Sequence, residues 1–205
     1  KYDKEGKIEW ATNIGGSSED KINSIAETKD GGYIVGGLFK STTIEIEDNK
    51  LINNGNSDGM IIKYDKEGKI EWATNIGGKN DDEIVSIAEA KDGGYIVGGY
   101  SKSDSIQAGE YTLKNNGNSD GVIVKYDSEG KVKWATNVGG DNDEYIQSVA
   151  ETSDGGYVVG GYFKSDSIQA GEYTLKNNGK SDAMIIKYNS EGKVKWATSI
   201  GGDQD

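Results

Sequence analysis

Acidic side chains gather in three short loops of this 205-residue chain, and the loops recur at a fixed spacing. Carboxylates, amides and backbone carbonyls are the ligands that Ca²⁺ prefers, so calcium is the one cofactor that such loops fit. The spacing matches neither an EF-hand loop nor the nonapeptide calcium repeat, so we expect solvated loops and no cofactor, with calcium as the alternative. The loops are Ser17-Ser18-Glu19-Asp20, Lys79-Asn80-Asp81-Asp82-Glu83 and Asp141-Asn142-Asp143-Glu144. The candidate calcium ligands are Asp81, Asp82, Asp141 and Asp143.

Paired carboxylates are also the minimum equipment for hydrolysis of a glycosidic bond. An enzyme would break the symmetry of the repeats at one place, and the sequence contains no singular acidic pair or other unique cluster. The chain has no Cys and no His, which removes thiol nucleophiles, imidazole bases, Ser-His-Asp triads and the usual zinc ligands. We therefore expect no catalytic residues and no enzymatic activity.

The same loops are candidates for contact with a partner, together with two tyrosines of a repeated insertion. An exposed tyrosine can stack on a sugar or anchor a protein. The first copy of the repeat has Asn49 in that place, and the alternative is a tyrosine that packs the insertion against its own unit. The candidate partner-binding residues are Asp20, Asp82, Glu144, Tyr111 and Tyr173.

The charge of the chain argues against nucleic acid as a partner. The formal net charge is -12, and all 23 basic residues are lysines. Phosphate backbones attract basic proteins, and arginine is the side chain best suited to clamp phosphate or to recognise guanine. No apolar run approaches the roughly 18 residues of a membrane span. We expect neither nucleic acid binding nor a membrane span.

The chain repeats itself. Tyr2, Tyr64, Tyr126 and Tyr188 stand 62 residues apart, and each opens a near-copy of one segment. Such a period is the mark of a stacked repeat architecture, whose function resides more often in a surface than in a single reaction centre. The predicted units are 17–78, 79–140 and 141–202, preceded by a partial unit at 1–16 and followed at 203–205 by the start of another.

Each unit is predicted to contain four strands. In the second unit, apolar runs at 84–90 and 95–100 flank Asp92-Gly93-Gly94, and runs at 121–126 and 131–137 flank a second turn. Such pairs indicate β-hairpins. The expected fold is all-β, with tandem four-stranded antiparallel meanders that resemble propeller blades. Trp10, Trp72, Trp134 and Trp196 are predicted core residues.

A long insertion separates the second and third strands of each unit, at 41–57, 103–119 and 165–181. A structureless loop of this length is uncommon, and residues 105–113 are predicted to form a small hairpin that Ile106 and Leu113 hold down. Because strand direction alternates in a meander, the insertions lie at the same end as the acidic loops. That end is the candidate functional surface.

Residues 7–14 are predicted to form an extra N-terminal strand that no other strand of its unit accompanies. Three blades are fewer than the roughly four to eight that close a propeller, so both outer faces would stay open. Unpaired strands and open apolar faces favour association with further copies of the chain. Self-association is therefore expected.

The motif DGGYIVGG at 92–99, linked to the pattern KYDxxGxxxWxxxxGG seen at 63–78, resembles the highly repetitive propeller repeats of bacterial and archaeal surface and secreted proteins. The resemblance covers essentially the whole chain. It implies a propeller-type fold and a surface, adhesion or sensing role, without catalytic residues. The predicted function is a non-enzymatic scaffold or protein interaction module of an extracellular or cell-surface bacterial protein. The alternatives are a glycan-binding module with one site per blade, and the sensor region of an intracellular signalling protein.

Overall fold

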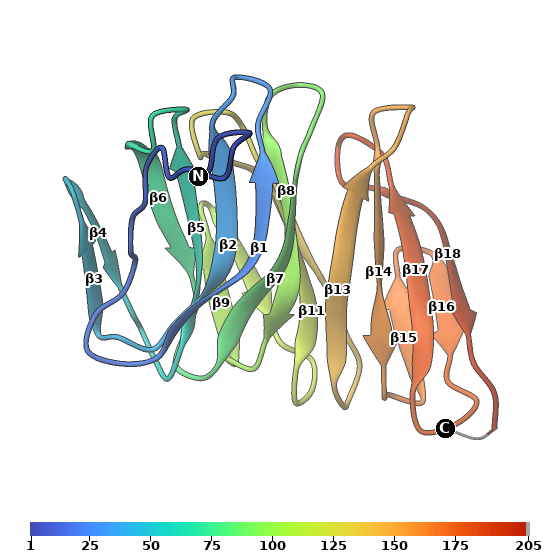
Figure 1. The fold of residues 1–205 in the computed structure, drawn as a ribbon. Coiled ribbons are helices and arrows are strands. Elements are labelled where there is room, and N and C mark those ends of the chain that lie inside the picture. Colours follow the sequence, from blue (N-terminus) through green and yellow to red (C-terminus); the bar gives the residue numbers. More distant parts are fainter. Residues whose placement is uncertain (204–205) are drawn as a thin grey trace.

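The protein is an open row of three four-stranded antiparallel sheets, each accompanied by a two-stranded hairpin (Figure 1). The computed structural model describes residues 1–203, in which 18 strands and no helix are present. Each sheet has four strands from one repeat unit, and neighbours in sequence pair as a meander once the insertion is left aside. The all-β fold and its three four-stranded repeat units are thus confirmed. Of the predicted start of another unit at 203–205, residues 204 and 205 lie outside the described residues.

The strands of the three units correspond one to one. Unit 1 contains β1 (Asp20–Glu27), β2 (Tyr33–Phe39), β5 (Asp58–Tyr64) and β6 (Ile70–Ile76) in its sheet, with β3 (Thr43–Ile46) and β4 (Asn49–Ile52) in the insertion. Unit 2 contains β7 (Asp82–Glu89), β8 (Tyr95–Ser101), β11 (Asp120–Tyr126) and β12 (Val132–Val138), with β9 (Ser105–Ala108) and β10 (Tyr111–Lys114). Unit 3 contains β13 (Glu144–Glu151), β14 (Tyr157–Phe163), β17 (Asp182–Tyr188) and β18 (Val194–Ile200), with β15 (Ser167–Ala170) and β16 (Tyr173–Lys176).

The predicted insertion hairpin is confirmed in all three units. In unit 2 the chain reverses at Gly109, which has a φ of 58° that favours glycine. Ile106 and Leu113 are buried beneath the hairpin, as expected. Strand β10 contacts β12 of its own unit, and β9 contacts β6 of the preceding unit. The insertions of units 2 and 3 therefore bridge the junction to the preceding sheet, since β15 contacts β12 in the same way.

Successive sheets pack face to face. Strand β7 packs against β1, β2 and β5 of unit 1, and β13 packs in the same way against β7, β8 and β11 of unit 2. Two of the buried apolar clusters lie in these junctions, and in one of them Ile34 and Ile61 of unit 1 join Ile84 and Ile87 of unit 2. A third cluster lies within unit 1, where the insertion and Ile14 cover the outer face of the sheet. The core is therefore divided between the sheets, and a unit that lacks a neighbour leaves part of its apolar surface uncovered.

Paired glycines in the second strand of each unit make room for two different neighbours. A Cβ at Gly98 would lie 2.6 Å from the side chains of both Ile146 and Val149 in the next unit. A Cβ at Gly99 would lie 1.9 Å from the carbonyl oxygen of Glu83, beside a β-bulge in the first strand of its own sheet. One glycine of the pair thus admits the next sheet and the other admits the adjacent bulged strand.

The extra N-terminal strand predicted at 7–14 is not formed. In that segment only Ile8 pairs, through an isolated antiparallel bridge to Tyr2. In a complete unit the fourth strand pairs with the third along its whole length, as β6 does with β5. Within residues 1–203, Tyr2 alone forms a bridge to this segment, so residues 7–14 have no ladder of the kind that holds β6.

Candidate interaction faces

The carboxylate of Asp82 is buried where the loop between units 1 and 2 enters β7. It accepts a hydrogen bond of 2.7 Å from the hydroxyl of Ser103 and another of 2.7 Å from the backbone N–H of Gly78. The hydroxyl of Ser101 donates to the other carboxylate oxygen. These donors belong to the inter-unit loop, the end of β8 and the start of the insertion. Asp82 therefore links the loop between units 1 and 2 to the start of the insertion of unit 2.

The matching residues Asp20 and Glu144 have the same role. Asp20 accepts a hydrogen bond of 2.7 Å from the hydroxyl of Ser41, and Glu144 accepts one of 3.1 Å from the backbone N–H of Ser165. Partial burial opposes ionisation of Asp20, but the hydrogen bond from Ser41 and others from the backbone lower its pKa overall. Asp82 and Glu144 are buried and Asp20 is half-buried, and all three accept hydrogen bonds from their own unit, so their contact with a partner stays a prediction.

Replacing Asp82 by alanine is expected to lower the free energy of unfolding by roughly 2–3 kcal/mol, because the buried serine hydroxyls and the Gly78 N–H lose their acceptor. Asp81→Ala is the control, since Asp81 is only half-buried and its ion pair with Lys102 spans 3.6 Å. Urea unfolding curves would measure both. An equal loss in the two variants would refute the structural role of Asp82.

A second row of buried carboxylates opens the third strand of each unit and consists of Asp58, Asp120 and Asp182. Burial raises the pKa of Asp58 above its ordinary value, although the amide of Asn75 donates a hydrogen bond of 2.8 Å to it. Unit 3 has Ser199 in place of that amide, and one carboxylate oxygen of Asp182 is left without a partner. Sequence reasoning missed this row, whose signal is a Ser-Asp pair directly before an apolar strand.

The structure does not gather the four candidate calcium ligands. Asp143 lies 3.0 Å from the ammonium of Lys164, Asp81 pairs with Lys102, and Asp141 is exposed. The carboxylate oxygens of Asp82 accept hydrogen bonds from the hydroxyls of Ser101 and Ser103. Within residues 1–203, no group of three or more His, Cys, Asp or Glu side chains is placed to hold a metal ion.

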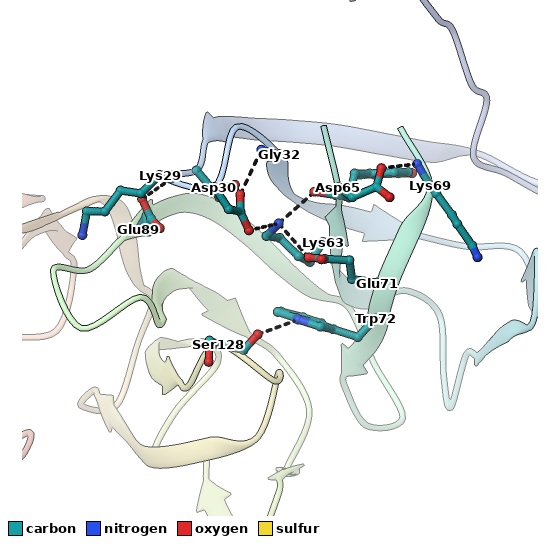
Figure 2. A network of polar contacts seen from close by, with 12 residues as sticks. Lys29, Asp30, Gly32, Lys63, Asp65, Lys69, Glu71, Trp72, Glu89 and Ser128 are labelled. Atoms are coloured by element: carbon teal, nitrogen blue, oxygen red, sulfur yellow. Dashed lines mark hydrogen bonds and ion pairs between the residues drawn. The ribbon is translucent and has the colours of Figure 1, made fainter. Parts of the chain in front are cut away.

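A buried lysine lies near the end of the third strand of each unit, which the sequence analysis did not single out. In unit 1 the ammonium of Lys63 lies 2.9 Å from Asp30 and 2.8 Å from Glu71 (Figure 2). Burial by itself lowers the pKa of Lys63, but the bonds to Glu71 and Asp30 raise it above its ordinary value. Hydrogen bonds from the hydroxyl of Thr28, the backbone N–H of Gly32 and the ammonium of Lys63 together lower the pKa of Asp30 to about 2. The lysine therefore stays charged inside the junction.

Units 2 and 3 keep the buried lysine but change its surroundings. Lys125 lies 2.9 Å from Asp92, as Lys63 does from Asp30. The residue that corresponds to Glu71 is Lys133 in unit 2 and Lys195 in unit 3. The second carboxylate beside the buried lysine is therefore specific to unit 1.

Tyr111 and Tyr173 anchor the insertions of units 2 and 3. Each hydroxyl donates to a backbone carbonyl of the fourth strand in the same unit, that of Lys133 at 2.9 Å and that of Lys195 at 2.7 Å. The hydroxyl groups therefore hold each insertion against its own unit, which agrees with the alternative that these tyrosines serve packing. Both side chains nevertheless remain partly exposed, so the rings are accessible to a ligand.

Tryptophans bridge adjacent units. The indole N–H of Trp72 donates to the carbonyl of Ser128 at 3.0 Å, and that of Trp134 donates to Ser190 at 3.0 Å (Figure 2 shows the first pair). Trp134 is buried as predicted, and Trp72 is half-buried. Trp196 is 44% exposed, which corrects the prediction that it belongs to the core.

The two outer faces of the row carry residues that match those of the inner junctions, and several of these residues are exposed. Ile146 is 0% exposed where unit 3 meets unit 2, whereas the matching Ile22 of unit 1 is exposed, and so is Ile25. On the opposite end, Trp196 and Ile200 are exposed. A Cβ built at Gly160 would have no atom within 4 Å. Gly160 corresponds to Gly98, but the space beside it that Ile146 fills at Gly98 is empty.

The N-terminal segment covers part of the first face. Trp10 lies 5.7 Å from Tyr33 and 6.4 Å from Tyr64 between ring centroids, as Trp72 does with the next unit's tyrosines at 5.7 and 6.3 Å. Its indole N–H also donates to the carbonyl of Lys66 at 3.2 Å. Trp10 thus occupies the position that the tryptophan of a preceding unit would take.

Comparisons with known proteins agree with a repeat architecture. No protein-family model matches the chain. It is 30% identical over 141 residues to the regulatory protein FlaEY of Caulobacter vibrioides, which covers 67% of this chain and 15% of that protein. It is 27% identical over 175 residues to an uncharacterized WD repeat-containing protein of Acanthamoeba polyphaga mimivirus, which covers 70% of this chain and 13% of that protein. The chain thus spans only a small part of either relative.

Among solved structures, the chain is similar to a protein of unknown function from Bacteroides caccae. The match covers 90% of this chain and 83% of that protein at 12% identity, with a TM-score of 0.29.

Residues 1–203 contain no helix with the length and apolar character needed to span a membrane. The row of four-stranded meanders, together with the similarity to a WD repeat-containing protein, supports a propeller-like repeat module.

Proposed function

We propose that this chain is a non-enzymatic, propeller-like scaffold that assembles end to end with further copies of itself, as part of a bacterial surface or secreted protein. One observation carries the proposal. The junction between sheets is built twice within the chain with matching residues, and each end face leaves some of those matching residues exposed, namely Ile22 and Ile25 on one face and Trp196 and Ile200 on the other. The motif DGGYIVGG and the resemblance it carries support the surface role.

The two end faces are complementary. If unit 1 of a second copy follows unit 3, Ile22 and Ile25 of that copy meet Gly160, as Ile146 and Val149 meet Gly98 inside the chain. Ile25 is 64% exposed in the single chain, whereas Val149 is buried. Burial of these side chains and of Trp196 would drive association by removing apolar surface from water. The contact is head to tail, so it produces an open filament or a closed ring.

Trp10 competes with this contact. The incoming Trp196 would require the position beside Tyr33 and Tyr64 that Trp10 holds in the single chain. An occupant tethered to the same chain has a high effective concentration, so it weakens binding of the external copy. Loss of Trp10 should therefore strengthen self-association, which an unrelated sticky patch would not do.

Sedimentation velocity of the full chain over a wide range of concentration tests the proposal. We expect the wild type to form concentration-dependent oligomers, Trp10→Ala to form them at lower concentration, and Gly160→Val to remain monomeric. Gly160 has open space in the monomer, so valine there should leave the unfolding curve unchanged. A wild type that stays monomeric, or a Gly160→Val variant that assembles normally, would overturn the end-to-end contact. Protection of the chain from protease on intact producing cells would overturn the surface role.

A further inference from the structure

We propose that the junction between units 2 and 3 holds a binding site for an acidic sugar, a monosaccharide unit that carries a carboxylate. A pocket of about 310 Å³ opens there beside the buried Lys125. Asp92, Tyr111 and Lys133 of unit 2 line it, together with Glu191 from the turn before β18 of unit 3. The proposal is independent of self-association, because both units belong to one chain.

Unit 1 shows what the pocket lacks. There the carboxylate of Glu71 lies 2.8 Å from the ammonium of the buried Lys63 (Figure 2). In unit 2 the matching residue is Lys133, and within residues 1–203 Asp92 is the one carboxylate paired with Lys125, which also donates to the carbonyl of Tyr126. The chain thus supplies its own carboxylate to the buried lysine in unit 1. In unit 2 that carboxylate is missing, and a ligand carboxylate fits its place.

Two sequence changes converge on this pocket. Relative to unit 1, Glu71 is replaced by Lys133 and Asn49 by Tyr111. The two new residues are joined by a hydrogen bond of 2.9 Å from the tyrosine hydroxyl to the lysine carbonyl, and both line the pocket. One change adds a cation and the other adds an aromatic face. Sugars offer an apolar face that stacks on aromatic rings, and an acidic sugar adds the anion.

The remaining lining groups suit sugar hydroxyls. Asp92 is paired with Lys125 through one carboxylate oxygen, Oδ1, which leaves the other free to accept from a hydroxyl. Glu191 accepts from Ser190 through one oxygen and also has acceptor capacity to spare. The pocket volume lies at the small end of ligand sites, which matches a single sugar ring. Lys125 and Lys133 would bind the carboxylate by charge-assisted hydrogen bonds.

The chain should hold one such site. Unit 3 repeats the tyrosine and both lysines as Tyr173, Lys187 and Lys195, but within residues 1–203 no turn of another unit covers them as Glu191 covers unit 2. Unit 1 has the following turn but not the tyrosine or the second lysine. Only the junction between units 2 and 3 combines all the parts.

An NMR titration of the full-length, ¹⁵N-labelled chain with D-glucuronate tests the inference. We expect amide shifts confined to the pocket, with a dissociation constant on the order of 1 mM for so small a ligand. Lys133→Glu, which restores the residue type of unit 1, should weaken binding about tenfold or more, whereas Lys131→Glu, an equal charge change two residues away, should not. The double variant Asn49→Tyr with Glu71→Lys should gain a second site between units 1 and 2.

Two further probes separate the parts of the ligand. D-glucose lacks the carboxylate and acetate lacks the sugar ring, and each should bind at least about tenfold more weakly than glucuronate. Glucose that binds as well would refute the role of the lysines, and acetate that binds as well would refute the sugar. Absence of any shift with glucuronate, or a Lys133→Glu variant that binds normally while its unfolding curve is unchanged, would overturn the site.

Discussion

Trp134→Ala is expected to lower the free energy of unfolding by about 3–5 kcal/mol, whereas Trp196→Ala should change it by less than about 1 kcal/mol. The two residues occupy the same position in β12 and β18. Trp134 is 8% exposed, lies 5.8 Å from Tyr157 and 6.1 Å from Tyr188 between ring centroids, and donates to the carbonyl of Ser190. Trp196 lies on the open end face, so its truncation removes little packing.

Urea unfolding followed by far-UV circular dichroism would compare the two variants, at a concentration low enough to keep the chain monomeric. Circular dichroism is preferred because both substitutions remove a fluorophore. Equal losses of stability would show that Trp134 and Trp196 have equally packed environments. That result would contradict the assignment of Trp196 to an open end face.

Gly161→Ala is expected to destabilise the chain by roughly 2–4 kcal/mol, while the adjacent Gly160→Ala should leave it unchanged or stabilise it by up to about 1 kcal/mol. A Cβ at Gly161 would lie 1.9 Å from the carbonyl oxygen of Tyr145 in the adjacent strand. Backbone cannot move aside as a flexible side chain can, so the bulged pairing of β13 with β14 must shift. At Gly160 the methyl enters open space.

Thermal and urea unfolding of the two alanine variants would measure the contrast within a single strand. Gly98→Ala serves as a third variant, because its Cβ would meet Ile146 and Val149 across an occupied junction. It should be less stable than Gly160→Ala, although the two glycines occupy the same position in their units. Similar stability of Gly98→Ala and Gly160→Ala would contradict the assignment of the first glycine to the junction.

Local patterns sufficed to predict most of the fold. The 62-residue period, the Asp-Gly-Gly turns and the paired apolar residues of the insertion each report on residues close in sequence. The predicted strand at 7–14 failed because a strand needs a partner, and the motif alone does not supply one. The prediction that Trp196 belongs to the core was wrong for a related reason. A tryptophan at this position is buried or exposed according to whether another unit covers it.

The candidate site was less predictable because burial of charge depends on contacts distant in sequence. Asp82 and Asp81 are neighbours with equal ligand chemistry, yet only Asp82 meets the serine hydroxyls about twenty residues further on. Lys125 is the single charge in the apolar run from 121 to 126, and a lone charge in such a run indicates a buried charged group. Its contrast with Lys63 becomes meaningful only when Glu71 is seen to reach it.

The manner in which the sheets are joined has a consequence for how such a chain can evolve. Within the described residues, the principal contacts between strands of different units join only immediate neighbours. Gain or loss of one 62-residue unit by recombination between near-identical repeats would therefore recreate the same junction at the point of exchange. We infer that array length can drift between generations without a loss of foldability, while differences such as Glu71 and Lys133 give individual members of the array separate identities.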